Sequence, residues 1–65
     1  MSVADNIVRM RNEQGITQRQ LADKVGIGQS MLAQIERGSK LPNVILANDI
    51  AKALNGSITE IVGAE

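Results

Sequence analysis

The 65-residue sequence contains no cysteine, no histidine and no aromatic residue. Without cysteine it can form neither disulfides nor thiolate metal sites, and without histidine it lacks the commonest metal ligand and the usual general base at neutral pH. No nucleophile with an activating partner stands out either. We therefore expect no bound metal, no cofactor and no enzymatic activity.

The missing aromatic residues and long apolar runs narrow the range of partners. A core without phenylalanine, tyrosine or tryptophan has to be aliphatic, and the stacking platforms that hold single-stranded nucleic acids are lacking. No stretch is as long and apolar as a membrane span, and the N-terminus has no signal-peptide pattern. These absences favour duplex DNA over single strands, argue against a membrane partner and predict a cytoplasmic protein.

An excess of either charge is also lacking, since seven basic and seven acidic residues cancel. A strong nucleic-acid binder is usually basic. The charges are nevertheless unevenly spread: residues 9–40 hold six basic and three acidic side chains, whereas the remainder holds one basic and four acidic ones. This pattern predicts a modest basic face with an acidic far side, and DNA binding that weakens only gently as salt is raised.

The length indicates a single domain over residues 1–65, and the sequence has no linker, repeat or low-complexity segment. We therefore expect no attached ligand-sensing domain and no small-molecule ligand. A chain of this size buries only roughly 60% of its unfolded surface, so pairing with a second copy would add stability.

Apolar periodicity and helix-ending residues predict an all-α fold of five helices. Ser2 is placed to cap the first helix and Gly15 to end it, and Thr17 with Gln20 forms a capping-box pattern at the start of the second. Glycine, proline and asparagine mark the later boundaries. The expected helices cover residues 3–14, 18–25, 29–37, 44–54 and 58–62.

The stretch Gln18–Arg37 organises the rest of the chain, because it predicts two short helices joined by a tight turn around Gly26. Glycine allows the positive φ that ends a helix abruptly. Successive residues of the second of these helices are about 100° apart, which puts Ile35 and Glu36 on its inner side. Two crossing helices with a glycine-containing connection, the second polar on its outside, form the helix-turn-helix of DNA-binding proteins.

The outer side of that second helix carries the candidate base-reading residues Gln29, Ser30 and Gln34. Their amides and hydroxyl combine donors with acceptors: glutamine pairs with adenine through two hydrogen bonds, and serine bonds more than one base. Glutamine and serine are also ordinary solvated helix residues, and composition alone favours that interpretation. The helix-turn-helix spacing reverses the preference, so we expect all three to face the major groove.

Residues at helix N-termini or beside the reading helix are candidates for the DNA backbone. Gln18 starts the second helix and Asn43 is placed to cap the fourth, and the exposed N–H groups of such ends suit phosphates. Arg19 projects away from the apolar side of the second helix, and Lys40 lies on the loop after the third. Each of these residues also fits a plain structural role, as a cap, a first-turn residue or a solvated charge.

Arg11 lies near the core side of the first helix, one turn after Ile7, and needs a carboxylate if it is partly buried. Glu36, on the inner side of the third helix, is the candidate partner. We therefore predict an Arg11–Glu36 ion pair that ties the first helix to the third.

Two apolar stripes leave alternatives open. Either Ile45 or Leu46 begins the buried side of the fourth helix. In the fifth helix Ile58, Ile61 and Val62 share one side, which either packs on the first helix or stays uncovered as a two-fold dimer contact. We expect a homodimer, with this side of the fifth helix as its candidate surface.

From Gly15 to Gly38 the sequence follows the pattern G-I-T-Q-x-x-L-A-x-x-x-G-I-x-x-x-x-L-x-x-I-E-x-G. With the Leu41-Pro42 pair and the IAKALN ending of the fourth helix, it resembles the lambda-repressor-like, Cro/XRE-type helix-turn-helix family over nearly the whole chain. Residues 22–30, ADKVGIGQS, are similar to the corresponding part of the repressor for which the family is named.

This resemblance implies a compact five-helix domain that binds duplex DNA. It implies that Gln18 braces Gln29 and the DNA backbone, that Gln29 reads an adenine, and that Ser30 reads a guanine edge. In the family, residues in the places of Arg11 and Glu36 often form a buried pair. Further base-edge or phosphate contacts are implied for Gln34, Arg37, Lys40 and Asn43.

Three residues depart from the family's pattern. Gly28 stands where most members have a Ser or Thr N-cap, which weakens the start of the third helix by about a few tenths of a kcal/mol. Met31 is bulky and either packs on a flank or touches a thymine methyl. Lys40 replaces an amide, which leaves a base contact there open.

Two functions fit the sequence. The favoured one is a sequence-specific transcriptional regulator, a repressor, that reads a near-palindromic operator in double-stranded DNA as a dimer with reading helices about 34 Å apart. The alternative is an antitoxin-like or adaptor module whose main partner is a protein. Zero net charge and the acidic C-terminal third favour the alternative, and the amides and hydroxyl on the outer helix oppose it.

Overall fold

Five helices follow one another along the chain: α1 (Val3–Gln14), α2 (Gln18–Val25), α3 (Gln29–Glu36), α4 (Val44–Ala53) and α5 (Ile58–Val62). The computed structural model describes residues 2–63, and this part of the chain contains no strand. The predicted all-α class and five-helix order are therefore confirmed, with helix ends within one residue of those expected. None of the helices over residues 2–63 has the length and apolar character that a bilayer span requires.

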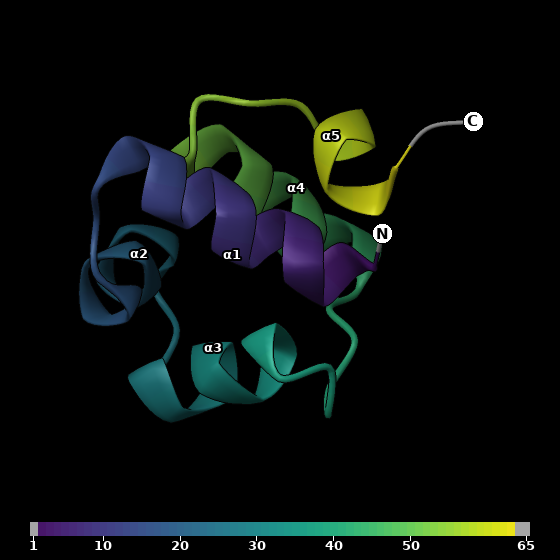
Figure 1. Cartoon of the computed structure of the whole chain (residues 1–65). Coiled ribbons are helices and arrows are strands. Elements are labelled where there is room, and N and C mark those ends of the chain that lie inside the picture. Colours follow the sequence, from purple (N-terminus) through teal and green to yellow (C-terminus); the bar gives the residue numbers. More distant parts are fainter. Residues whose placement is uncertain (1, 64–65) are drawn as a thin grey trace.

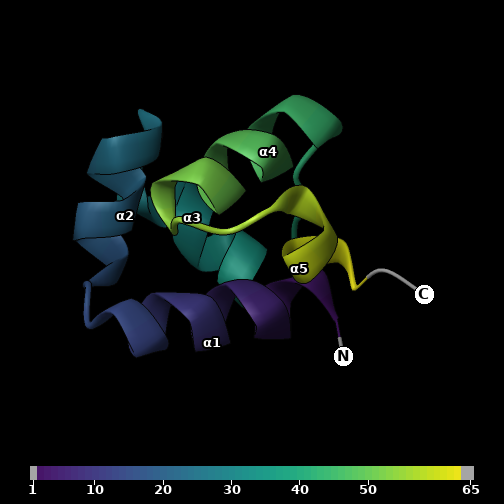
Figure 2. The same cartoon turned by 90° about the horizontal axis from the view of Figure 1, so that it is seen from above.

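The helices pack so that α3 has support on one side only. Helix α1 packs against both α3 and α5, while α2 packs against α3 and α4. In Figures 1 and 2, α2 and α5 lie at opposite ends of the molecule, and Figure 1 shows α3 along an outer side away from α5. The side of α3 that faces away from α1 and α2 is consequently available to a partner.

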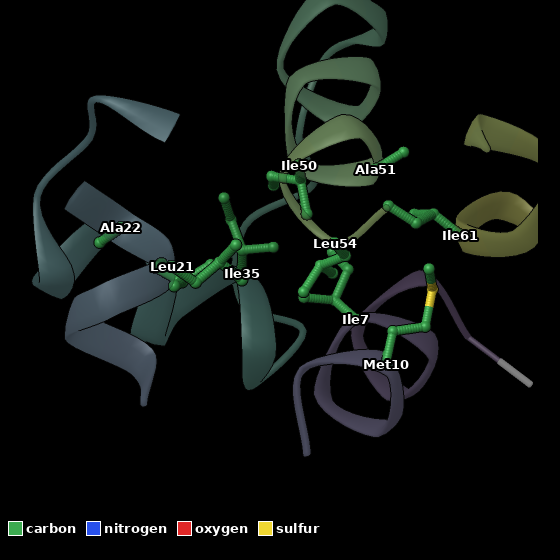
Figure 3. Packing of buried hydrophobic residues seen from close by; sticks show 10 residues of the cluster. Ile7, Met10, Leu21, Ala22, Ile35, Ile50, Ala51, Leu54 and Ile61 are labelled. Carbon is green, nitrogen blue, oxygen red and sulfur yellow. The ribbon is translucent and has the colours of Figure 1, made fainter. Parts of the chain in front are cut away.

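The core is aliphatic and takes side chains from every helix, as Figure 3 shows around Ile7, Leu54 and Ile61. Complete burial of a side chain of this size contributes about 1.5–3 kcal/mol. Because the contributions come from all five helices, the buried side of α3 is held in place by the core of the whole domain. The largest fully buried side chains are Ile7, Leu21, Leu32, Ile35, Ile50, Leu54 and Ile61.

The structure decides the alternatives left open for α4 and α5. Leu46 packs against the core, whereas Ile45 is 75% exposed. The prediction of Ile61 as a dimer contact is wrong, because its side chain is completely buried where α5 packs on α1 and α4. Only Val62, which is 50% exposed, and the half-buried Ile58 remain of that surface.

Local hydrogen bonds explain where the helices begin and end. The Ser2 side chain accepts from the Asp5 N–H at 3.1 Å, and Thr17 and Gln20 form the reciprocal capping box at 3.0 and 2.8 Å. Helix α4 ends at Ala53 with Leu54 as its C-cap, and the positive φ that turns the chain away follows at Asn55 (φ 57°) rather than at the glycine after it. Asparagine tolerates this conformation better than most residues with a side chain.

A buried asparagine that the sequence analysis missed holds α5 in place. Asn6 is 4% exposed, and its Nδ2 donates to the Ile61 carbonyl oxygen at 2.8 Å. The last carbonyls of a helix lack partners within that helix. Asn6 therefore satisfies a carbonyl at the end of α5 and joins it to α1.

We predict that Asn6→Ala lowers the free energy of unfolding by about 1–3 kcal/mol, because it leaves the buried Ile61 carbonyl without its donor. A domain of this size loses roughly 4–8 °C of thermal midpoint per kcal/mol. The control is Asn12→Ala, which changes an exposed asparagine on the same helix. Equal midpoints of the two variants in thermal denaturation followed by circular dichroism would contradict the role given to Asn6.

Candidate nucleic-acid interface

A three-residue turn sets α3 against α2. Gly26 adopts a φ of 86°, and the N–H groups of Gly26 and Ile27 both donate to the Ala22 carbonyl, at 2.9 and 3.0 Å. Ile27 also packs against the core. Hydrogen bonds and packing thus fix the connection, so α2 and α3 form a helix-turn-helix of defined geometry.

Helix α3 has a buried and an outer side. Leu32 and Ile35 are buried, and Gln29 and Ser30 are exposed in the first turn. Gln34, the third predicted base-reading residue, is only half-buried one turn further along. The first turn of α3 is therefore its most accessible polar part.

The half-buried Met31 packs against the core, on the flank of α3. Gly28 occupies the N-cap position and offers no side-chain hydrogen bond to the first turn.

A hydrogen bond joins the first residues of α2 and α3. Gln29 Nε2 donates to Gln18 Oε1 at 3.4 Å, which is long for a hydrogen bond but places the two amides side by side. Gln18 is the first residue of α2, and Thr17 caps that helix. The bracing contact that the family resemblance implies is thus present between these two side chains.

Behind this pair lies the ion pair between Arg11 and Glu36. Arg11 Nε donates to Glu36 Oε2 at 2.8 Å and Arg11 Nη2 donates to Glu36 Oε1 at 3.0 Å, so the guanidinium grips both carboxylate oxygens. The side chains are only 15% and 6% exposed. The remaining Nη1 donates to the Ile16 carbonyl at 3.0 Å. One arginine thus ties α1 to α3 and to the turn before α2.

The sequence analysis missed the contact that connects these two pairs. Gln18 Nε2 donates to Glu36 Oε1 at 3.2 Å, so hydrogen bonds run from Arg11 through Glu36 and Gln18 to Gln29. The sequence did indicate that Glu36 needs a second donor, since a carboxylate offers about four acceptor sites and one arginine does not occupy all of them. The identity of the second donor follows only from the three-dimensional packing.

The predicted backbone-contacting residues lie around α3. Asn43 Oδ1 accepts from the Leu46 N–H at 2.8 Å, which leaves the donors of its amide nitrogen for another partner. After Gly38 (φ 81°), the N–H of Lys40 donates to the Gln34 carbonyl at 3.3 Å, and this turns the loop back to the end of α3. The side chains of Arg19, Arg37, Lys40 and Asn43 all belong to exposed residues.

Exposed charges of both signs occur on both sides of the domain, but in different proportions. On α2, at the end of α3 and in the following loop, the four exposed cations Arg19, Lys24, Arg37 and Lys40 stand beside one exposed anion, Asp23, whereas α4 and α5 carry the exposed Asp49 and Glu60 beside Lys52. On α1, Arg9 and Glu13 are 3.4 Å apart and offset one another. The helix-turn-helix side is therefore the more basic one.

Three exposed apolar side chains also lie in and just after the loop that follows α3; the exposure of Ile45 was one of the alternatives left open, and that of the other two was not anticipated. Leu41, Val44 and Ile45 are 77%, 75% and 75% exposed. The run from Val44 to Leu46 contained a signal for this, because one side of a helix cannot bury three consecutive residues.

Comparison with known proteins agrees with this geometry. A family model described as helix-turn-helix matches residues 7–61. An uncharacterized HTH-type transcriptional regulator of Sinorhizobium fredii is 38% identical over 60 residues, which is 92% of this chain and 78% of that protein. The immunity repressor protein of Bacillus phage phi105 is 38% identical over 65 residues, which is all of this chain but 45% of that repressor.

Solved structures show the same fold. The P22 c2 repressor, crystallised with synthetic operator 9T, matches with a TM-score of 0.91 at 25% identity, over 100% of this chain and 98% of that one. An HTH_3 family transcriptional regulator from Vibrio cholerae matches with a TM-score of 0.85 at 29% identity, over 91% of this chain and 33% of that one. The family match includes both helices of the helix-turn-helix and most of the core, and the chain belongs to the HTH_3 helix-turn-helix family.

Proposed function

We propose that this protein is a sequence-specific transcriptional regulator, a repressor, that binds operator DNA with α3 in the major groove. The observation that carries the proposal is the exposed first turn of α3, where Gln29 and Ser30 stand on a helix fixed from behind by a buried aliphatic core. Side chains that combine donors with acceptors are those that distinguish base edges in this groove.

The relatives support binding rather than catalysis as the activity. The phi105 protein is named an immunity repressor, and the P22 c2 repressor was crystallised with an operator. Because this chain matches both over its full length, we infer that residues 1–65 act as one operator-binding domain. Such a protein acts where the DNA is, which places it in the cytoplasm at the nucleoid.

Base contacts and backbone contacts have different consequences. Base contacts give sequence specificity, whereas phosphate contacts fix the orientation of the protein on the duplex. We assign base reading to Gln29, on adenine, to Ser30, on a guanine edge, and to Gln34. Backbone or supporting contacts are assigned to Gln18, Arg19, Arg37, Lys40 and Asn43.

A dimer bound to its operator would repress transcription by blocking the polymerase from the DNA. Two copies related by a two-fold axis place two α3 helices in successive major grooves, about 34 Å apart, on a near-palindromic site. The part of the predicted dimer surface that stays accessible is Val62 with the edge of Ile58.

Selection of bound duplexes from a random pool tests base reading. We predict that the parent enriches one near-palindromic sequence. Gln29→Ala should bind it about 5- to 150-fold more weakly, the equivalent of about 1–3 kcal/mol for a bidentate base contact, and Ser30→Ala should bind it more weakly as well. Undiminished affinity of both variants in gel-shift titrations would contradict readout by α3, and no enrichment even at low salt would favour a protein partner instead.

A phosphate contact is tested by Asn43→Asp. Aspartate keeps the oxygen that caps α4 but replaces the amide nitrogen with a second negative oxygen, so we predict weaker binding to operator and random duplexes alike. Thr59→Asp is the matched control, since it adds the same charge to exposed α5, away from α3. Titrations that find both variants equally weakened would indicate a general charge effect and no contact at Asn43.

The dimer surface is tested by introducing the same negative charge at two different exposed apolar positions. We predict that Val62→Asp weakens self-association by about tenfold or more, because a carboxylate in an apolar contact loses its hydration. Ile45→Asp, which alters an exposed apolar residue of α4, should leave self-association unchanged. Sedimentation equilibrium provides the measurement. The opposite outcome would move the contact to the start of α4, and a parent that stays monomeric on a full operator would refute the dimer.

A further inference from the structure

The carboxylate of Glu36 accepts hydrogen bonds from two residues with different tasks. Its two oxygens take the Arg11 guanidinium at 2.8 and 3.0 Å, and Oε1 also takes Gln18 Nε2 at 3.2 Å. A carboxylate paired with arginine only accepts hydrogen bonds. The Gln18 amide therefore has to turn its NH2 group toward Glu36, since its oxygen would face another acceptor.

The direction imposed on Gln18 is passed to Gln29. With its nitrogen turned inward, Gln18 offers its oxygen to Gln29, whose Nε2 donates to it at 3.4 Å. That bond uses one of the two protons on Gln29 Nε2. The second proton and Gln29 Oε1 remain as a donor and an acceptor in a fixed order, with the donor on the side of Gln18.

This fixed order matters for reading a base. In the major groove adenine presents the N7 acceptor beside the N6 donor, and glutamine pairs with both only when its own donor and acceptor are in matching order. A reversed amide would place its oxygen opposite N7, where two acceptors repel. The direction of the hydrogen bonds that link Glu36, Gln18 and Gln29 therefore affects base preference as well as stability.

We propose that Glu36 is a positioning residue for base reading: its carboxylate sets the amide direction of Gln18 and, through Gln18, that of Gln29, and so fixes the base preferred at one position of each half-site. The inference rests on the proposed function, since it concerns the base that Gln29 reads.

Glu36→Gln is the informative variant. Arg11 donates to both carboxylate oxygens and Gln18 donates to Oε1, so the new amide has one oxygen where three donors point. We expect that oxygen to keep the shorter bond, to Arg11 Nε at 2.8 Å, which leaves the NH2 group in the place of Oε1, facing Gln18. Gln18 and then Gln29 reverse in turn. We expect the preference for adenine at the Gln29 position, about 5- to 150-fold in the parent, to fall below about threefold in duplex selection. Preferences at the Ser30 and Gln34 positions should stay as in the parent.

Two further variants separate amide direction from loss of stability. Arg11→Lys removes the bidentate hydrogen bonding to Glu36 but keeps a cation beside the carboxylate. It should therefore lower the thermal midpoint and retain the adenine preference. The double variant Glu36→Gln with Gln18→Glu returns an acceptor to Gln29 at unchanged net charge, so it should regain the adenine preference, even though a carboxylate near the phosphates weakens overall binding.

The outcomes distinguish this inference from the proposed function. If the parent protein enriches no duplex, the proposed function itself is contradicted. A parent that enriches an operator, together with a Glu36→Gln variant that keeps its adenine preference or loses all preferences equally, overturns only the role of Glu36.

A measurement on the parent tests the amide direction even if Glu36→Gln does not fold. Nuclear Overhauser contacts should connect the Gln18 side-chain NH2 to the Arg11 guanidinium protons. Contacts of that NH2 to Gln29 alone would show the reverse direction and refute the inference.

Discussion

The buried pair of Arg11 and Glu36 lies where three helices meet, and the geometry of the site depends on it. Arg11 is in the last turn of α1, its Nη1 holds the turn before α2 through the Ile16 carbonyl, and Glu36 ends α3. Removing two charges from water costs free energy that a pair regains only with good geometry and additional hydrogen bonds. Here the guanidinium donates three bonds and the carboxylate accepts three, so both charges are compensated.

The aliphatic core and this pair have complementary roles. Hydrophobic burial is non-directional, so side chains such as Leu21, Leu32 and Ile50 hold the helices together without fixing the rotation of any polar group. Directional bonds supply what the core cannot. The bond from Asn6 orients the end of α5, and those to Glu36 orient the start of α2 and hence the first turn of α3.

Local features of the fold were predictable from the sequence and long-range ones were not. Caps at Ser2 and Thr17 depend on neighbours three residues away, so they are visible in the chain itself. The outer side of α3 likewise follows from helical periodicity, and the charge partner of Arg11 from the need of a buried cation. By contrast, the contacts Asn6–Ile61 and Gln18–Glu36 span 55 and 18 residues and depend on exact packing. For the same reason the sequence left open whether Ile61 packs on α1 or stays uncovered, since an apolar stripe does not reveal what covers it.

A regulator with no net charge has to discriminate chiefly through base contacts. Phosphate attraction supplies nearly all affinity for random duplexes, and only a few exposed cations, such as Arg37 and Lys40, stand beside α3. Weak attraction to random sequence makes each base contact a larger share of the total, so the role proposed for Gln29 gives its orientation a large effect on selectivity. A buried ion pair is seldom the most stable filling for a core, and apolar residues often replace one without loss. Apolar residues in its place would leave Gln18 without an acceptor behind it, so base selection gives a reason for a carboxylate at Glu36 that stability alone does not.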